Sequence, residues 1–110
     1  MDYKEILDKC KLTENEMKAF LKHSEKMDPK KDHKMAYRTL MNPTRRSVLK
    51  GIGFNVKTTQ ELINELNIEE DQLNYHLSML EQLHFIMDCQ DGWKSTPRGI
   101  GFLTNATVEF

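Results

Sequence analysis

The sequence predicts a mainly helical α+β fold, and three observations along the chain support this class. Residues 58–83 have the pattern of two helices joined by a tight turn. Two strand-like segments follow, joined by Gln90-Asp91-Gly92, a sequence typical of a hairpin. Three further helical patterns precede position 42. Together these elements predict a winged helix-turn-helix with an N-terminal helical extension and a β-hairpin wing.

The first helix of the pair begins with a capping box. The Thr58 hydroxyl is placed to accept a hydrogen bond from the amide of Glu61, whose carboxylate reaches back to the amide of Thr58. The apolar face of this helix consists of Leu62, Ile63 and Leu66. In the turn that follows, we expect Ile68 to be an apolar plug between the two helices.

The second helix of the pair, residues 70–83, has two distinct faces when its residues are placed at about 100° each. One face is an apolar stripe that includes a histidine: Leu73, His76, Leu77, Leu80 and Leu83. The opposite face is polar: Asp71, Asn74, Tyr75, Ser78 and Gln82. We expect His76 to be a hydrogen-bonded core histidine rather than a ligand.

Residues 1–41 are predicted to form an arm of three helices. The first has about three turns, with one apolar face made of Tyr3, Ile6, Leu7 and Cys10. A capping box of Thr13 and Glu16 opens the second. Its apolar face consists of Met17, Phe20 and Leu21.

The third helix of the arm is predicted over residues 32–41, with Asp32 as its cap, because Pro29 ends the preceding helix. Its inward side chains are expected to be Met35, Ala36 and Leu40. The arm has two possible uses: it covers the back of the winged helix in the same monomer, or its apolar faces meet a second subunit. The small core leaves limited room for so many apolar faces, which favours the second subunit.

Residues 42–104 are predicted to form the winged helix, and residues 105–110 a tail. Asn42 caps the first helix with Pro43 at its first position, and Val48, Leu49 and Ile52 face inward. Residues 54–57 are expected to supply a third strand beside the hairpin strands at 85–89 and 93–96. A last short helix is predicted through residue 103.

Three segments of the chain resemble the ArsR-type winged-helix regulators of bacteria and archaea. The segments are Asn42-Pro43-Thr44-Arg45-Arg46-Ser47-Val48-Leu49, Thr58-Thr59-x-Glu61-Leu62 and Leu77-x-x-Leu80-Glu81-x-Leu83-x-x-Ile86. The resemblance covers roughly residues 40 to 100. It implies a homodimeric, sequence-specific DNA-binding regulator of transcription that dimerises through its terminal helices.

On this hypothesis the polar face of residues 70–83 enters the major groove of double-stranded DNA. The candidates for reading base edges are Asn74, Tyr75, Ser78 and Gln82. The candidates for holding the DNA backbone are Arg45, Arg46, Lys50, Lys57, Lys94 and Arg98.

The distribution of charge favours a second hypothesis. Residues 1–41 hold ten Lys or Arg and eight Asp or Glu, whereas residues 42–110 hold six and nine. Glu69, Glu70 and Asp71 also stand at the start of the proposed recognition helix. An acidic surface repels phosphates, so the alternative is a winged helix that binds another protein, as an accessory or antagonist subunit, and does not bind DNA.

The sequence gives little support for catalysis. It has no glycine-rich phosphate loop, paired metal-ligand spacing or nucleophile motif, and we expect no enzyme activity, cofactor or metal. Cys10 and Cys89 are interpreted as small buried hydrophobes, with a redox switch as the alternative. Metal sensing occurs in the resembling family, so a site made of Cys10 with His23 or His33 stays open.

No apolar run approaches about 18 residues, the length that spans a membrane. The first five residues lack the basic and then apolar pattern of a signal peptide. We therefore expect a cytoplasmic protein.

Overall fold

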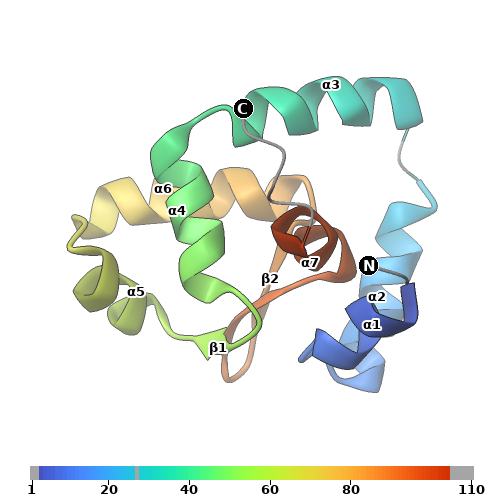
Figure 1. Ribbon diagram of the computed structural model, residues 1–110, viewed down its shortest axis with the longest axis horizontal. Helices are drawn as coiled ribbons and strands as arrows, with labels where there is room; N and C mark the ends of the chain where they lie inside the picture. Colours follow the sequence, from blue (N-terminus) through green and yellow to red (C-terminus); the bar gives the residue numbers. More distant parts are fainter. Residues whose placement is uncertain (1–2, 27, 105–110) are drawn as a thin grey trace.

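The computed structural model describes residues 3–26 and 28–104, which form a mainly helical fold with one small antiparallel sheet (Figure 1). The predicted α+β class is confirmed. The tail at 105–110 lies outside the described residues. The elements are α1 (Tyr3–Lys9), α2 (Glu14–Ser24), α3 (Pro29–Leu40), α4 (Pro43–Ile52), β1 (Val56–Lys57), α5 (Thr59–Leu66), α6 (Glu70–Gln82), β2 (Ile86–Cys89), β3 (Gly92–Ser95) and α7 (Pro97–Thr104).

The three strands lie in the order β1-β3-β2, with antiparallel neighbours. Cys89 pairs with Gly92, so Gln90 and Asp91 form the hairpin turn. Gly92 has φ 140°, and a Cβ atom at this position would lie 2.9 Å from the backbone oxygen of Lys57. The position therefore requires glycine, both for its backbone angle and for the close approach of β1.

The hydrophobic core lies between α4, α5, α6 and β2. Its fully buried side chains include Val48, Leu49, Ile52, Leu62, Leu73, Leu77, Leu80 and Ile86. Burying one such side chain stabilises the fold by about 1.5–3 kcal/mol. Half-buried Ile68 packs against this cluster from the turn between α5 and α6, as the sequence predicts.

The helix caps agree with the sequence at three of four positions. The capping boxes of Thr13 and Thr58 both form, and the Asn42 side chain accepts a hydrogen bond from the amide of Arg45 at 3.0 Å. The prediction for α3 was wrong: this helix begins at Pro29, with Asp28 as its cap. Proline is well suited to the first position of a helix, where its missing N–H has no partner to lose.

Three further details of the arm differ from the sequence prediction. Helix α1 ends at Lys9 and has about two turns rather than three. Leu21, which was placed on the apolar face of its helix, is 42% exposed, and Met35 is 53% exposed although it was expected to face inward. The remainder of the chain covers Phe20 and Leu40 but does not extend over these two neighbours.

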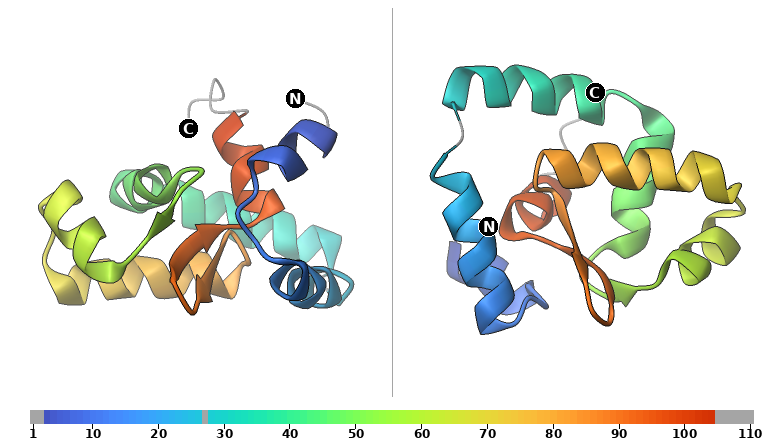
Figure 2. Two further views of the ribbon diagram at one scale, coloured as in Figure 1. Left: turned by 90° about the horizontal axis from the view of Figure 1, so that it is seen from below. Right: turned by 180° about the vertical axis from the view of Figure 1, so that it is seen from behind.

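The arm packs against the rest of the same chain. Helix α1 contacts α7, and α3 contacts α4. Figure 2 shows α1 and α2 beside α7 and the hairpin, with α3 lying above α6 in the rear view. These contacts cover part of the winged-helix segment within one chain, and the contact with a second subunit that the sequence favours stays a prediction. No helix in the described part of the chain is long and apolar enough to cross a membrane.

Replacing Gly92 by alanine should lower the free energy of unfolding by about 1–3 kcal/mol, because the new Cβ forces an unfavourable φ and meets the backbone of β1. The matched control is Gly51→Ala in α4, where a Cβ would meet only side chains at 3.4 Å or more. The control should be neutral or stabilising by up to about 1 kcal/mol. Chemical denaturation measures both, and equal destabilisation would contradict the assignment of strain to Gly92.

Candidate functional site

The solvent-facing side of α6 brings together the four side chains predicted to read bases. Asn74, Tyr75, Ser78 and Gln82 are all exposed, with Tyr75 at 57%. The opposite side is buried through Leu73, His76, Leu77 and Leu80. Within the described residues, the side chains of Asn74, Ser78 and Gln82 make no hydrogen bond, so their donors and acceptors face solvent.

A buried arginine fixes α6 against two other helices. Arg45 of α4 is 5% exposed and donates from Nε to Nδ1 of His76 at 3.3 Å. Its Nη1 donates to the carbonyl oxygen of Thr39 in α3 at 3.0 Å. The guanidinium carbon also lies 5.5 Å from the ring centroid of Tyr75. His76 is therefore the hydrogen-bonded core histidine that the sequence predicts.

The other residues that were predicted to contact the DNA backbone lie in different environments. Arg46 donates from Nη1 to the carbonyl oxygen of Leu40 at 2.7 Å. Lys57 pairs with Glu65 at 2.6 Å, and Arg98 pairs with Asp32 at 2.7 Å. Lys50 is exposed on α4.

Lys94 is buried and joins the hairpin to the arm. Its Nζ lies 2.8 Å from Glu16 of α2 and 3.2 Å from Asp91, and its side chain is 3% exposed. Partial burial acts to raise the pKa of Glu16, but the hydrogen bonds from Lys94 and the Thr13 amide lower that pKa to about 2. The carboxylate therefore stays charged at neutral pH and anchors α2.

These environments change the set of cations available to a ligand. The structure places Arg45 and Lys94 in the interior, where their hydrogen-bonding groups already have protein partners. Neither side chain reaches a phosphate from this position. Sequence reasoning missed this because an arginine near a helix start and a lysine in a strand carry no local signal of burial.

The surface around α6 is acidic. From position 58 to position 93 the chain contains no Lys or Arg. The same stretch holds eight carboxylates, all exposed: Glu61, Glu65, Glu69, Glu70, Asp71, Glu81, Asp88 and Asp91. Phosphates that approach this surface are repelled unless cations from other elements offset the charge.

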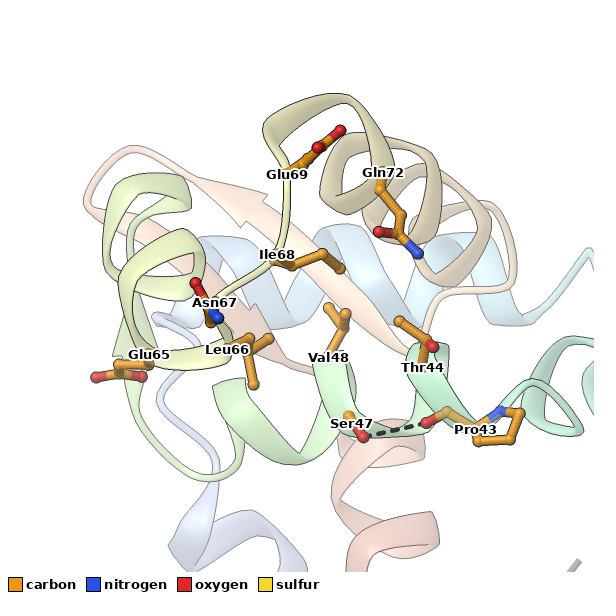
Figure 3. A pocket seen from close by; sticks show the side chains of 10 residues that line it. All are labelled: Pro43, Thr44, Ser47, Val48, Glu65, Leu66, Asn67, Ile68, Glu69 and Gln72. Carbon is orange, nitrogen blue, oxygen red and sulfur yellow. Dashed lines mark hydrogen bonds between the residues drawn. The ribbon is translucent and has the colours of Figure 1, made fainter.

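An open groove of about 790 Å³ lies at the start of α6, between α4 and the end of α5 (Figure 3). The side chains of Val48, Leu66 and Ile68 point into it, whereas the carboxylates of Glu65 and Glu69 point away toward its rim. The groove thus has an apolar floor and an acidic edge. Apart from the apolar plug expected at Ile68, no sequence pattern predicted this groove.

The cysteines and histidines do not assemble into a ligand set. Among the described residues, no three His, Cys, Asp or Glu side chains are grouped so as to hold a metal ion. Burial raises the pKa of Cys10, and burial together with the nearby Glu16 raises that of Cys89 to about 12. Both thiols therefore stay protonated, and hence weakly reactive, at neutral pH. His23 stacks on His84 with ring centroids 5.0 Å apart.

The chain is similar to a protein of Archaeoglobus fulgidus that is described only as uncharacterized. The two are 30% identical over 79 residues, which is 72% of this chain and 91% of the archaeal protein. No family model matches the chain, and no solved structure does.

The buried His76 makes stability depend on pH. Burial, and then the adjacent Arg45, lower the pKa of His76 below its ordinary value of 6.5. Below about pH 6.5 the unfolded chain binds a proton that the folded chain does not, so the free energy of unfolding should fall as the pH decreases. Denaturation between pH 8 and 5 measures this decrease, and His76→Gln should make it shallower.

His84 also has a lowered pKa, through burial and then His23, and acts in the same direction. His84→Asn is the companion variant, because asparagine tolerates the positive φ of 60° at this position. A pH dependence that both single variants leave unchanged would contradict this account.

Glu16→Gln should lower the free energy of unfolding by about 1.5–3 kcal/mol, because it removes a charged partner from the buried Lys94 ammonium. Glu14→Gln on the same helix is the matched control. Its pair with Lys18 is 3.6 Å long and well exposed, so its loss should cost less than about 1 kcal/mol. Equal effects of the two variants in urea denaturation would show that the buried pair does not anchor the arm.

Proposed function

We propose that this chain, which belongs to the same family as the Archaeoglobus fulgidus protein, is a winged helix-turn-helix regulator of ArsR type that binds double-stranded DNA. In this proposal α4, α5 and α6 are the three helices of the winged helix, and the β2–β3 hairpin is the wing. Its place of action is the cytoplasm.

One observation carries the proposal: α6 is buried along one side and presents uncommitted hydrogen-bonding side chains along the other. Asn74 and Gln82 have the amide groups that pair with adenine, and Ser78 pairs with several bases. The hairpin that follows α6 is a second projection that reaches along the DNA. A helix packed in this way inserts into a major groove without disturbing the core.

A homodimer would place two copies of α6 on one duplex. The terminal helices α1 and α7 contact each other, so they present one joint surface. Leu7 on α1 is 38% exposed at this end of the molecule. We propose that a second copy packs here, which leaves α3 and α6 open to solvent.

The acidic surface favours a second candidate function, a protein-binding winged helix. Its support is the run from position 58 to position 93, with eight exposed carboxylates and no cation, beside a groove with an apolar floor. Such a surface fits a partner with a basic rim and an apolar anchor.

Fluorescence anisotropy on a duplex from upstream of the protein's own gene, and on a random duplex, tests the DNA proposal at two salt concentrations. We expect tighter binding to the upstream duplex, weakened by salt. Asn74→Ala should cost about 1–3 kcal/mol on that duplex and little on random DNA. Asn15→Ala, an exposed asparagine on α2, is the control.

Two results would contradict the proposal. If Asn74→Ala lowers the affinity for both duplexes equally, Asn74 does not read a base. No binding at low salt by folded protein would favour the protein-binding function, and a pull-down with α6 variants would then follow.

A further inference from the structure

Helix α3 carries a row of positive charge. Lys30, Lys34 and Arg38 recur every four residues, and all three are exposed, as is Lys31 beside them. Residues four apart lie above one another on a helix, about 6 Å apart at 1.5 Å per residue. The helix therefore presents a row of cations along its exposed side.

The carboxylates of this segment do not neutralise the row. Asp32, the acid within α3, pairs with Arg98 of α7 at 2.7 Å on the inner side. Asp28, which precedes the helix, accepts a hydrogen bond from the amide of Lys30 as its cap. On α2, by contrast, Lys18 has Glu14 as a partner four residues away.

Like charges four residues apart destabilise a helix by about 0.2–0.5 kcal/mol a pair. Helix α3 contains two such pairs, Lys30 with Lys34 and Lys34 with Arg38. An anion with regularly spaced charges relieves this repulsion, whereas a neutral partner does not. The chemistry of the row therefore fits a polyanion.

The position of α3 relates the row to α6. Arg45 bonds the carbonyl of Thr39, at the end of α3, and also His76 in the middle of α6. Arg46 also donates a hydrogen bond to the end of α3, at the carbonyl oxygen of Leu40. Seen from behind, α3 runs above α6 across the molecule (Figure 2). A chain of phosphates bound to α3 would thus lie at a fixed offset from the exposed face of α6.

We propose that the outer face of α3 is the phosphate-binding surface of this protein and holds the DNA backbone while α6 faces the groove. The inference rests on the proposed function and assigns backbone contacts to Lys30, Lys31, Lys34 and Arg38. In this arrangement the cations of α3 offset the repulsion between DNA phosphates and the carboxylates between positions 58 and 93.

A charge-matched pair of triple variants tests the assignment in the full chain. The first replaces Lys30, Lys34 and Arg38 by glutamine, and the second replaces Lys18, Lys22 and Lys26 of the α2 segment by glutamine. Both change the net charge by the same amount and alter exposed side chains. Anisotropy on specific and random duplexes over a series of salt concentrations gives the affinity and its salt slope.

We expect the α3 variant to bind both duplexes at least about tenfold more weakly, with a salt slope flatter by about 2 to 3, roughly one for each lost contact. The α2 variant should change the slope by less than about 1. A variant with arginine at positions 30 and 34 should bind like the wild type. The α3 variant should melt no lower than the wild type, because it relieves repulsion.

The outcomes separate this inference from the proposed function. If the wild type binds DNA but the two triple variants lose affinity equally, only net charge matters and the assignment to α3 is overturned while DNA binding stands. If the α3 variant instead loses dimerisation in light scattering, the row contacts a second copy and the assignment is likewise overturned. If the wild type binds no duplex at low salt, both proposals are overturned.

Discussion

The relative placement of three helices depends on one buried guanidinium, that of Arg45. It lies within α4, bonds the end of α3 through Thr39, and bonds α6 through His76. Arginine suits this role because its planar group has several donors in fixed directions and stays charged. The cost is that His76 must remain neutral, since its Nδ1 accepts a hydrogen bond. The Arg45 side chain therefore links α6 to α3, although the two helices are far apart in sequence.

The sequence predicted the elements whose signals are local. The capping boxes at Thr13 and Thr58 each use residues three apart, and both form. The two faces of α6 follow from its repeat of apolar residues, and the structure has the same division. Asp28 shows the limit of such signals, since Asp32 is also a good cap, and Pro29 fits the first turn of a helix as well as it ends one.

The environment of each cation could not be predicted in the same way. Arg45, Lys57, Lys94 and Arg98 all looked like surface charges, yet each meets a partner from a distant element or strand. The most distant of these partners are 31, 66 and 78 residues away along the chain, separations that no local pattern encodes. The cations of α3 were visible in the sequence, but their significance required knowing that Asp32 points inward to Arg98.

The two ion pairs that hold the arm can form only late in the synthesis of the chain. Glu16 and Asp32 are synthesised early, whereas their partners Lys94 and Arg98 follow 78 and 66 residues later. At about 5–20 residues per second, the interval for Glu16 is about 4 to 16 s. During that time the helices of the arm have no ion pair to the hairpin or to α7. Both ion pairs of the arm therefore form only after the hairpin and α7 have been synthesised.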